Sequence, residues 1–421
     1  MCPGVYRTAF QRPTAGPHSW VVKRAGNVEP GQWHPRKLHW SDMTTLRVIV
    51  DQIVAPIPGG IGRYTEELTR ELIRTAPFGC EVAGIVSASP EQDYDLITTL
   101  LPGLSELFKS ALARRELELA WQHGFTRLPG SGMLHATGLF APLSKHDRLH
   151  DRGTQTVVTI HDVIPWTHPE SLSSRRLGWY KAMVKRAHRY ADAVVVPTHA
   201  VAAQLAEIID FGDRVRVIGG AVSSKLTRPV DPDARAARLE LPDRYILSVG
   251  TLEPRKGLIP LIQSLSRPEL DDVTLLIAGP EGWKGMDIAG IAAEAGLAEG
   301  RVRSLGYLAD ADLAVALDRA SVFVFPSLAE GFGLPMIEAF SCGTPVVHSD
   351  DPAVVEVSAG AGIAVARDDP ESYPERLAMA IAVVLADPAL AKRLGVEGRD
   401  RARAYSWADS AERVWQLHAD L

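Results

Sequence analysis

Short runs of β-branched and other apolar residues alternate with segments of helical periodicity along most of the chain. Within residues 61–75, for example, Ile61, Tyr64, Leu68 and Leu72 recur every three or four positions, which predicts one apolar face of a helix. Regular alternation of strand and helix is typical of parallel sheets whose strands are joined by crossover helices. The pattern therefore predicts an α/β fold.

The alternation runs twice along the chain, which predicts two domains. Strands of the first half are predicted at residues 46–51, 81–86, 133–135, 156–161, 193–197 and 215–219. Strands of the second half are predicted at residues 245–250, 273–278, 302–305, 322–326 and 345–348. A polar stretch rich in Pro and Arg, residues 223–244, lies between the halves, and single cores stop growing near ~250–300 residues. We therefore predict domains at 43–225 and 226–404, with a further helix at 405–421.

Composition and charge narrow the classes of function. Lys and Arg number 45 against 51 Asp and Glu, a formal net charge of −6, which argues against a nucleic-acid partner because that binding needs a basic footprint. The cysteines Cys2, Cys80 and Cys342 lack metal-site spacing and are typical of a reducing compartment. The sequence has no apolar run of the ~20 residues that spans a bilayer and no secretory signal, so we expect a cytoplasmic protein.

Residues 1–42 differ from the rest of the chain. They hold many Pro, Gly, Trp, His and Arg residues and no apolar periodicity. We interpret them as a disordered extension, or as the result of a start codon placed upstream of a true start near Met43. Deleting them should leave activity and melting temperature unchanged, and a large loss of either would refute the interpretation.

The most informative motif is a glycine-rich turn that follows the apolar run 321–326. Glu330 and Glu338 stand eight positions apart across it, and Pro335 suits the start of a helix whose first turn would hold Glu338. Free N–H groups at a helix start attract phosphate, and carboxylates accept hydrogen bonds from hydroxyls. The motif predicts a sugar-nucleotide site, whereas the alternative is a structural turn with solvated glutamates.

A basic pair, Arg255 and Lys256, directly follows a predicted strand of the second half. Fixed cations can stabilise the charge that develops on a departing diphosphate, in place of a metal. The alternative is a solvated basic pair on a loop. Glu253 would orient the pair.

The glycine loop at Gly59 and Gly60 lies between the first strand and the first helix, where glycine lets backbone approach a ligand closely. Thr65 stands where a nicotinamide-binding G-x-G-x-x-G motif needs its last glycine, so that cofactor is not expected. Arg63 is a candidate contact to an anionic acceptor group, or an ordinary surface arginine.

Three Asp-x-Asp triplets raise the question of a metal site. Two lie in polar connecting stretches and the third is a candidate helix start, where Asp is a favoured cap. The triplets are Asp93/Asp95, Asp231/Asp233 and Asp310/Asp312. We predict no metal and no other cofactor.

Taken together in order, the motifs at residues 58–64, 159–162 and 250–257 and the Glu330/Glu338 element make the chain resemble glycosyltransferase family 4. The resemblance covers the chain from about residue 46 to its end. It implies the GT-B fold, in which two Rossmann-like domains face each other with the donor site in the cleft between them. It also implies that the C-terminal helix crosses back to the first domain.

The residues of these motifs are most similar to those of bacterial mannosyltransferases of polysaccharide assembly. The resemblance implies a retaining, metal-independent hexosyltransferase that uses a nucleotide sugar, with GDP-mannose favoured, and a glycan or lipid-linked acceptor in cell-surface polysaccharide synthesis. Attack would come from the same face, helped by the leaving phosphate. Alternatives are transfer of glucose or another hexose from a UDP-sugar, a sugar-nucleotide epimerase, and a non-catalytic nucleotide-sugar binding protein.

The resemblance also assigns site residues. The catalytic candidates are His161, Lys256 and Glu330, and the acceptor-side candidates are Arg63, His135 and Asp162, with Asp162 orienting His161. Donor binding falls to Gly59, Gly60, Arg255, Lys256, Glu330, Gly331, Phe332, Gly333, Leu334, Pro335 and Glu338, of which Glu330 would contact the sugar and Glu338 the ribose. Many relatives carry an Arg where this chain has Thr251, so Arg255 or a residue elsewhere must supply the second positive charge. For His161 and His135 the alternative is a structural strand-end histidine.

Residues 175–190 are basic and have helical periodicity. Their apolar members recur at helical spacing: Leu177, Tyr180, Val184 and Ala187. A solvated helix face explains the pattern, and the alternative is peripheral contact with anionic lipid at the inner face of the membrane. Lipid-linked acceptors would give such contact a use.

Overall fold

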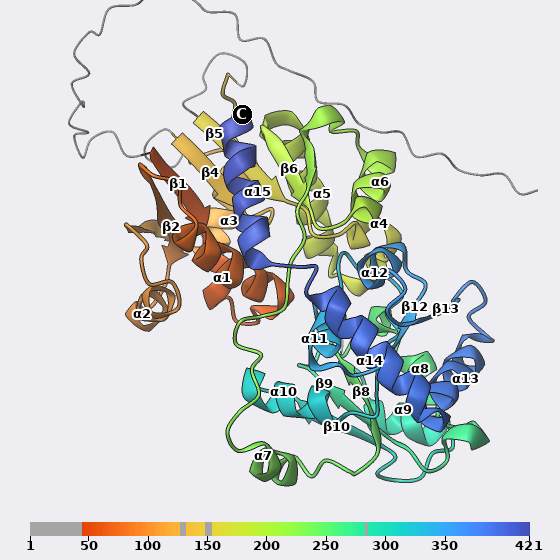
Figure 1. The fold of residues 1–421 in the computed structure, drawn as a ribbon. Helices are drawn as coiled ribbons and strands as arrows, with labels where there is room; N and C mark the ends of the chain where they lie inside the picture. Colours follow the sequence, from red (N-terminus) through yellow and green to blue (C-terminus); the bar gives the residue numbers. More distant parts are fainter. Residues whose placement is uncertain (1–43, 127–131, 148–153, 283–284) are drawn as a thin grey trace, which may run out of the picture. The chain divides into compact units, whose positions relative to one another are not determined.

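The structure is a computed structural model that describes residues 44–126, 132–147, 154–282 and 285–421. The strands of these residues form two separate sheets, and both sheets are wholly parallel (Figure 1). The predicted extension at residues 1–42 lies outside the described residues. Residues Met43–Leu421 belong to one unit. No helix of the described residues is both long enough and apolar enough to cross a bilayer.

The first sheet has the strand order β3-β2-β1-β4-β5-β6-β7. Its strands are β1 Thr44–Ile49, β2 Cys80–Ala88, β3 Leu107–Ala113, β4 Gly132–Ala136, β5 Thr154–Thr159, β6 Ala193–Val196 and β7 Val215–Val217. The helices between them are α1 Gly59–Arg74, α2 Glu91–Leu100, α3 Arg114–His123, α4 Ile164–Thr167, α5 Ser174–Tyr190 and α6 His199–Ile208. Helices α1, α2 and α15 (Trp407–Asp420) contribute to the core on one face, and α3, α5 and α6 contribute to the core on the other.

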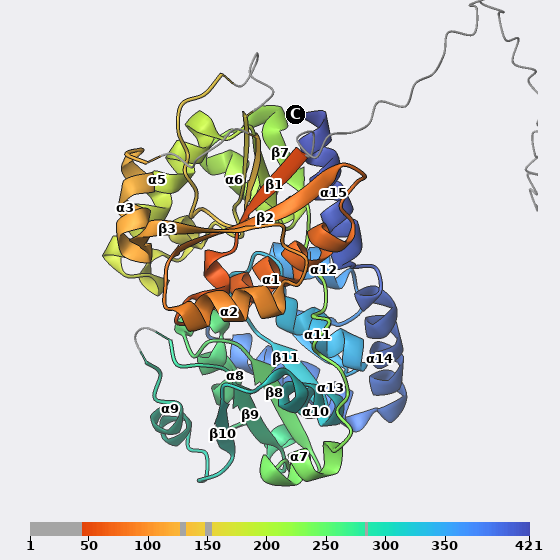
Figure 2. The ribbon, with the colours of Figure 1, turned by 90° about the vertical axis from the view of Figure 1, so that its left-hand side faces the viewer.

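The second sheet has the order β10-β9-β8-β11-β12-β13. Its strands are β8 Tyr245–Val249, β9 Thr274–Ala278, β10 Val302–Gly306, β11 Val322–Phe325, β12 Val346–Ser349 and β13 Ile363–Val365. Its helices are α7 Pro232–Arg238, α8 Leu258–Ser264, α9 Ile288–Glu294, α10 Asp310–Arg319, α11 Leu334–Cys342, α12 Pro352–Ser358, α13 Tyr373–Ala386 and α14 Pro388–Ala402. Figure 2 shows these helices around the second sheet.

Every strand predicted from an apolar run is present, with ends that shift by at most two residues. Two strands were not predicted. The edge strand β3 alternates partly buried and exposed residues and so makes no apolar run, and β13 is a short edge strand whose central residue is exposed. The polar stretch 223–244 contains a short helix, α7, rather than only a linker.

Both sheets reverse their strand order once, between β1 and β4 and between β8 and β11. At such a switch point the loops leave the carboxyl ends of neighbouring strands in opposite directions, which opens a crevice where ligands of α/β sheets bind. The loop that leads to Gly59 follows β1, and the loops that carry Lys256 and Glu330 follow β8 and β11. The fold thus brings these predicted donor residues to two switch points.

The C-terminal segment is the second connection between the two domains, after the stretch 223–244. Helix α14 packs on α11, and α15 packs on α1, as Figures 1 and 2 both show. The indole Nε1 of Trp415 donates to the Leu72 carbonyl at 3.2 Å, and that of Trp407 to the Val222 carbonyl at 3.0 Å.

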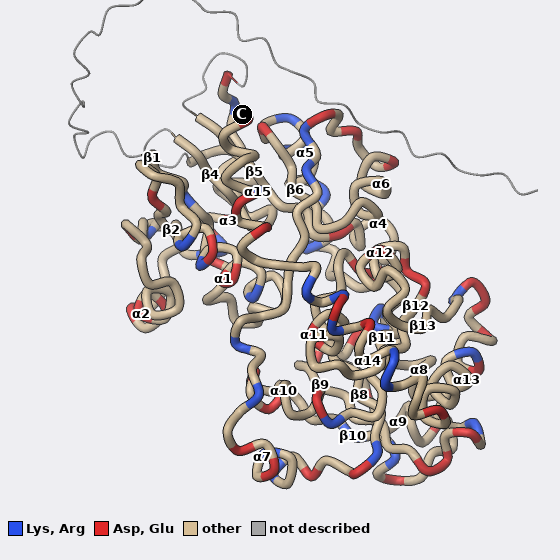
Figure 3. The backbone as a smooth tube through the Cα atoms, in the orientation of Figure 1, with Lys and Arg blue, Asp and Glu red and all other residues tan. Residues whose placement is uncertain are grey.

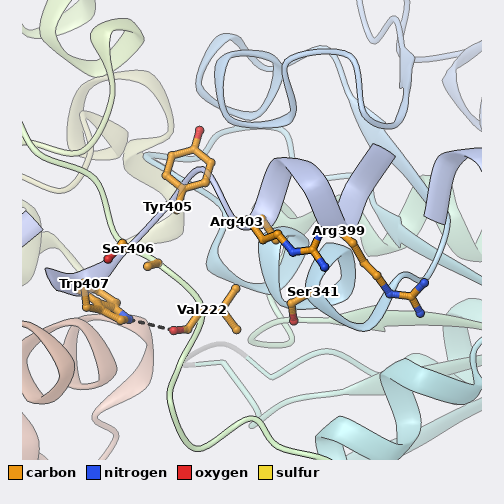
Figure 4. A pocket seen from close by; sticks show the side chains of 9 residues that line it. Val222, Ser341, Arg399, Arg403, Tyr405, Ser406 and Trp407 are labelled. Carbon is orange, nitrogen blue, oxygen red and sulfur yellow. Dashed lines mark hydrogen bonds between the residues drawn. The ribbon is translucent and has the colours of Figure 1, made fainter. Parts of the chain in front are cut away.

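Beside Trp407 lies a pocket of about 330 Å³, lined also by Arg399, Arg403 and Tyr405 (Figure 4). None of the predicted site residues lines it.

Candidate functional site

A largely buried ion pair lies at the second sheet's switch point. Lys256 ends a short 3-10 turn after β8, and Glu330 follows β11. The Lys256 Nζ donates to Glu330 Oε1 at 2.5 Å, and the two side chains are 14% and 10% exposed. The two residues that sequence motifs predicted independently for catalysis are therefore in direct contact.

Arg255 completes this cluster. Its Nη1 lies 3.6 Å from Glu330 Oε1 and donates to the Ala329 carbonyl at 2.8 Å, and its Nη2 donates to Glu253. Burial lowers the pKa of Lys256, whereas Lys256 and Arg255 outweigh the effect of burial on Glu330 and hold its pKa below the usual value. Glu330 is therefore a carboxylate at neutral pH, beside two cations.

Gly331 brings the two domains into contact at this cluster. A Cβ built on Gly331 would lie 1.8 Å from the His161 carbonyl oxygen of the first domain. The Gly331 carbonyl in turn accepts a hydrogen bond from Thr198 Oγ1 at 3.1 Å. Only a residue without a side chain permits this approach, so the glycine in the motif has a steric reason that involves the other domain.

His161 directly follows the Ile160 that ends the apolar run, but its ring is not held by Asp162. Its Nε2 donates to the Thr137 carbonyl at 2.7 Å, and its ring packs edge-on against Tyr64 at 4.9 Å between centroids. Burial lowers the pKa of His161 to about 4, so the ring is neutral at pH 7. With Nε2 as the donor, Nδ1 is an acceptor and cannot protonate a leaving group.

The prediction that Asp162 orients His161 is wrong. Asp162 Oδ1 accepts the backbone N–H of Ile164 at 3.0 Å, so the carboxylate caps the turn that starts α4. Such local capping is a common use of Asp. Burial raises the pKa of Asp162, and the nearby Arg255 opposes that shift.

Helix α11 begins immediately after the glycine turn. Gly333 has φ 91°, a left-handed conformation that suits glycine, and Pro335 is the second helical residue. The side chain of Phe332 packs edge-on against Tyr405 at 5.3 Å, and Leu334 packs into two core clusters. These two predicted donor residues therefore use their side chains for packing and leave only backbone for a ligand.

Glu338 lies one turn deeper in α11 than predicted, as its fifth residue rather than in the first turn. Its side chain is 3% exposed and accepts a hydrogen bond from Arg63 of α1, Nη1 to Oε1 at 2.5 Å. Arg63 was predicted to face the acceptor, and in this structure it instead pairs with Glu338 and Asp310 of the second domain. No local pattern predicts this pairing, because Arg63 lies 275 positions from Glu338 and 247 from Asp310.

The glycine loop forms the start of α1. Gly59 has φ 58°, which favours glycine, and a Cβ on Gly60 would lie 3.8 Å from Leu334 Cδ1. The loop of the first domain therefore lies against the start of α11. This places Gly60 beside the backbone N–H groups predicted to bind the diphosphate.

His135 does not line the acceptor side, contrary to the prediction. It is fully buried in β4, and its ring packs against His418 of α15 at 5.6 Å between centroids. The C-terminal helix covers it, which a strand-end position cannot reveal. Burial lowers the pKa of His135 to about 4 and that of His418 well below its usual value.

This buried histidine pair should make stability depend on pH. Between pH 6.5 and about 4 the unfolded chain binds a proton at His135 and the folded chain does not, so the free energy of unfolding falls as pH is lowered through this range. The loss should approach about 3 kcal/mol for His135 near pH 4. Denaturant unfolding of His135→Leu from pH 7.5 to 4.5 should show a shallower fall than the wild type. His123→Gln, on the exposed end of α3, is the control, and an unchanged slope in His135→Leu would contradict the prediction.

The Asp-x-Asp triplets serve helices and arginines. Asp93 and Asp95 lie within α2, Asp231 directly precedes α7 and accepts a hydrogen bond from Arg235, and Asp233 lies inside α7, so the prediction that these triplets lie in connecting stretches is wrong. Asp310 starts α10 as predicted, and Asp312 binds Arg235 and Arg238. Over the ranges that the structure describes, no cluster of three His, Cys, Asp or Glu side chains has a geometry suited to a metal ion.

Two models of known families together match most of the chain. Residues 58–225 match the model described as glycosyltransferase family 4, and residues 231–401 match the model described as glycosyl transferases group 1. The boundary between the matches falls at the start of α7.

Similar characterised proteins include several mannosyltransferases. The O-antigen chain mannosyltransferase B of Escherichia coli is 28% identical over 272 residues, 62% of this chain and 68% of that protein. The MMP alpha-(1->4)-mannosyltransferase of Mycolicibacterium hassiacum is 27% identical over 400 residues, 84% of this chain and 92% of that protein. A serotype-specific mannosyltransferase of Escherichia coli is 30% identical, but the match spans only 32% of its length.

Solved structures share the arrangement of two domains. Sucrose-phosphate synthase from Thermosynechococcus elongatus matches with a TM-score of 0.67 and 24% identity, over 90% of this chain and 98% of that one. The Anabaena protein HepE, in complex with UDP and glucose, matches with a TM-score of 0.67 and 18% identity, over 90% and 100%. At this identity the likeness establishes the fold, which is GT-B.

Proposed function

Because the chain belongs to glycosyltransferase family 4, we propose that it transfers a hexose from a nucleotide sugar to a glycan or lipid-linked acceptor, with retention at the anomeric carbon and without a metal. The single observation that carries the proposal is the largely buried Lys256–Glu330 pair, which lies at a switch point and adjoins His161 of the facing domain through Gly331. Cations beside a hydroxyl-accepting carboxylate suit a sugar that is bonded to a diphosphate.

In this proposal each group has one task. Lys256 and Arg255 stabilise the charge on the diphosphate as the bond between the anomeric carbon and the phosphate oxygen breaks. Glu330 accepts hydrogen bonds from the sugar hydroxyls, and backbone N–H groups at the start of α11 bind phosphate. The acceptor hydroxyl attacks from the same face, and its proton passes to the departing phosphate. His161, neutral and tied to Thr137, contributes shape and a hydrogen-bond acceptor rather than acid catalysis.

The proposed donor is GDP-mannose, and the proposed setting is cell-surface polysaccharide synthesis. Support comes from the relatives, because two that cover large parts of the chain are named as mannosyltransferases, one of them of O-antigen chains. A UDP-sugar is the second candidate, since HepE, a protein of the same fold, was solved in complex with UDP-glucose. Two alternatives remain. An epimerase would convert the nucleotide sugar without an acceptor, and a non-catalytic binding protein would bind it without turnover.

A thermal-shift screen against GDP-mannose, UDP-glucose and ADP-glucose, with EDTA present, tests the proposal. A ligand at 100 times its Kd stabilises the folded state by about 2.7 kcal/mol. We expect selective stabilisation by GDP-mannose, and loss of that stabilisation in Glu338→Ala. Selective stabilisation by UDP-glucose would replace mannose by another hexose, and no shift with any nucleotide sugar would contradict the transferase proposal.

Helix α5 is the proposed site of peripheral membrane contact. Figure 3 shows the Lys and Arg positions along it, and Arg175, Arg176, Lys185 and Arg189 are exposed. The apolar side of the helix is not available, because Met183, Val184 and Ala187 are buried in the core.

Any membrane contact through α5 would therefore be electrostatic. Sedimentation with vesicles that contain anionic lipid should show binding at low salt that disappears as salt is raised. Absence of binding at low salt would contradict it.

A further inference from the structure

One arginine joins the first domain to the predicted ribose carboxylate of the second. Arg63, on α1, donates from Nη1 to Glu338 Oε1 at 2.5 Å and from Nη2 to Asp310 Oδ1 at 2.6 Å. Glu338 is on α11, and Asp310 is the first residue of α10. The guanidinium fork therefore spans two carboxylates from two helices of the facing domain, a geometry that lysine could not reproduce.

Burial makes Glu338 depend on this contact. Its side chain is 3% exposed and that of Arg63 is 22% exposed. Within the described ranges Arg63 is its one ion-pair partner, and the other charges that act on it, Asp310 and Glu67, are negative. Burial raises the pKa of Glu338, and Arg63 opposes that shift. Without Arg63, a buried carboxylate that faces two others would favour its protonated form.

The contact uses one carboxylate oxygen and leaves the other. Arg63 binds Oε1, and no residue in the described part of the chain donates a hydrogen bond to Oε2. Ribose hydroxyls need an ionised acceptor with a fixed direction, because a protonated carboxyl has less capacity to accept. Arg63 supplies both conditions.

We infer that Arg63 is a positioning residue for the nucleotide: it holds Glu338 ionised and oriented, with Oε2 available to the ribose hydroxyls. The inference rests on the proposed function, from which the ribose role of Glu338 is taken. Arg63 is thereby assigned to donor binding and not to the acceptor side. Because Arg63 belongs to the first domain, nucleotide affinity and the contact between the domains become coupled, and each strengthens the other.

Calorimetric titration of the full chain with GDP and with UDP, at pH 7.5 and 6.0, tests this inference. For the nucleotide that binds the wild type, Arg63→Met should raise Kd by about 10-fold at pH 7.5. The loss should grow at pH 6.0, because Glu338 then takes up a proton more readily than in the wild type. Arg63→Lys, which restores the charge without the fork, should recover part of the affinity.

The matched control is Arg74→Met on the same helix, where the arginine is 62% exposed and pairs with Glu71. It should bind as the wild type does at both pH values. Failure of the wild type to bind either nucleotide would contradict the proposed function itself. Wild-type binding together with unchanged or tighter binding in Arg63→Met, and the same pH profile, would overturn the inference about Arg63.

A double variant covers the case in which Arg63→Met folds poorly. Arg63→Met with Glu338→Gln removes both charges and so leaves no buried carboxylate without its cation. If Arg63 acts through Glu338, the double variant should bind about as weakly as Glu338→Gln alone and show the same pH profile as that single variant. Additive losses would mean that Arg63 acts independently, which would overturn the inference.

Discussion

Replacing Lys256 with alanine is expected to lower the rate of hexosyl transfer by about 10²- to 10³-fold, the usual effect of removing one group that stabilises transition-state charge. Lys256 is 14% exposed and its Nζ lies 2.5 Å from Glu330, so its charge is shielded from water and acts strongly on nearby groups. Among the cations of the described residues, the change leaves Glu330 only the more distant Arg255, at 3.6 Å. We therefore expect kcat to fall by more than KM rises.

Steady-state transfer assays with the donor found in the thermal-shift screen would measure this effect. Lys109→Ala is the matched control, because Lys109 is 43% exposed and pairs with Glu91 on the surface. It should keep wild-type kinetics. If Lys256→Ala kept kcat within about threefold of the wild type while remaining folded, Lys256 would not act on the departing diphosphate.

Replacing Gly331 with alanine is expected to abolish most transfer and to destabilise the fold. The new methyl group would lie 1.8 Å from the His161 carbonyl oxygen. The backbone fixes the position of this methyl group and the oxygen belongs to the backbone, so neither can rotate away. Relief requires the loop after β11 to move away from the loop after β5. Displacement of reacting groups by about 1 Å can lower a rate by 10²-fold, and forced overpacking destabilises by about 1–3 kcal/mol.

Gly178→Ala in α5 provides the control, because a Cβ at Gly178 would meet no atom within 4 Å. Inside a helix this change should stabilise the protein by about 0.5–1 kcal/mol. The two variants should thus shift the melting temperature in opposite directions. An active Gly331→Ala enzyme with the melting temperature of the wild type would show that His161 and Gly331 do not meet as closely as the structure places them.

Much of the architecture and part of the site follow from local sequence. The period of the apolar positions predicts α1 and the central strands because a buried strand or helix face must be apolar whatever surrounds it. Lys256 and Glu330 were each predicted as a site residue that follows a strand of the second half, and parallel strands end at one edge of a sheet, where ligands bind. A turn with positive φ, such as the one at Gly333, likewise favours glycine because of the local backbone conformation alone.

The pairings between distant residues depended on tertiary structure. Arg63 and Glu338 are 275 positions apart, and Arg63 and Asp310 are 247 apart. The sequence around a charged side chain does not identify its partner. An acceptor contact and a surface position were therefore equally consistent with the sequence around Arg63. His135 shows the same limit, since only the return of α15 to the first domain buries it against His418.

The amino-acid sequence by itself determined the two α/β domains, the positions of most of their strands along the chain and the residue types of a sugar-nucleotide site. The tertiary structure alone decided which oxygen of Glu338 is occupied, that Asp162 caps a turn, and that Gly331 meets the other domain. The physical reason is that hydrophobic periodicity and backbone conformation are set by neighbours in the chain. Ion pairing, burial and close packing are set by neighbours in space.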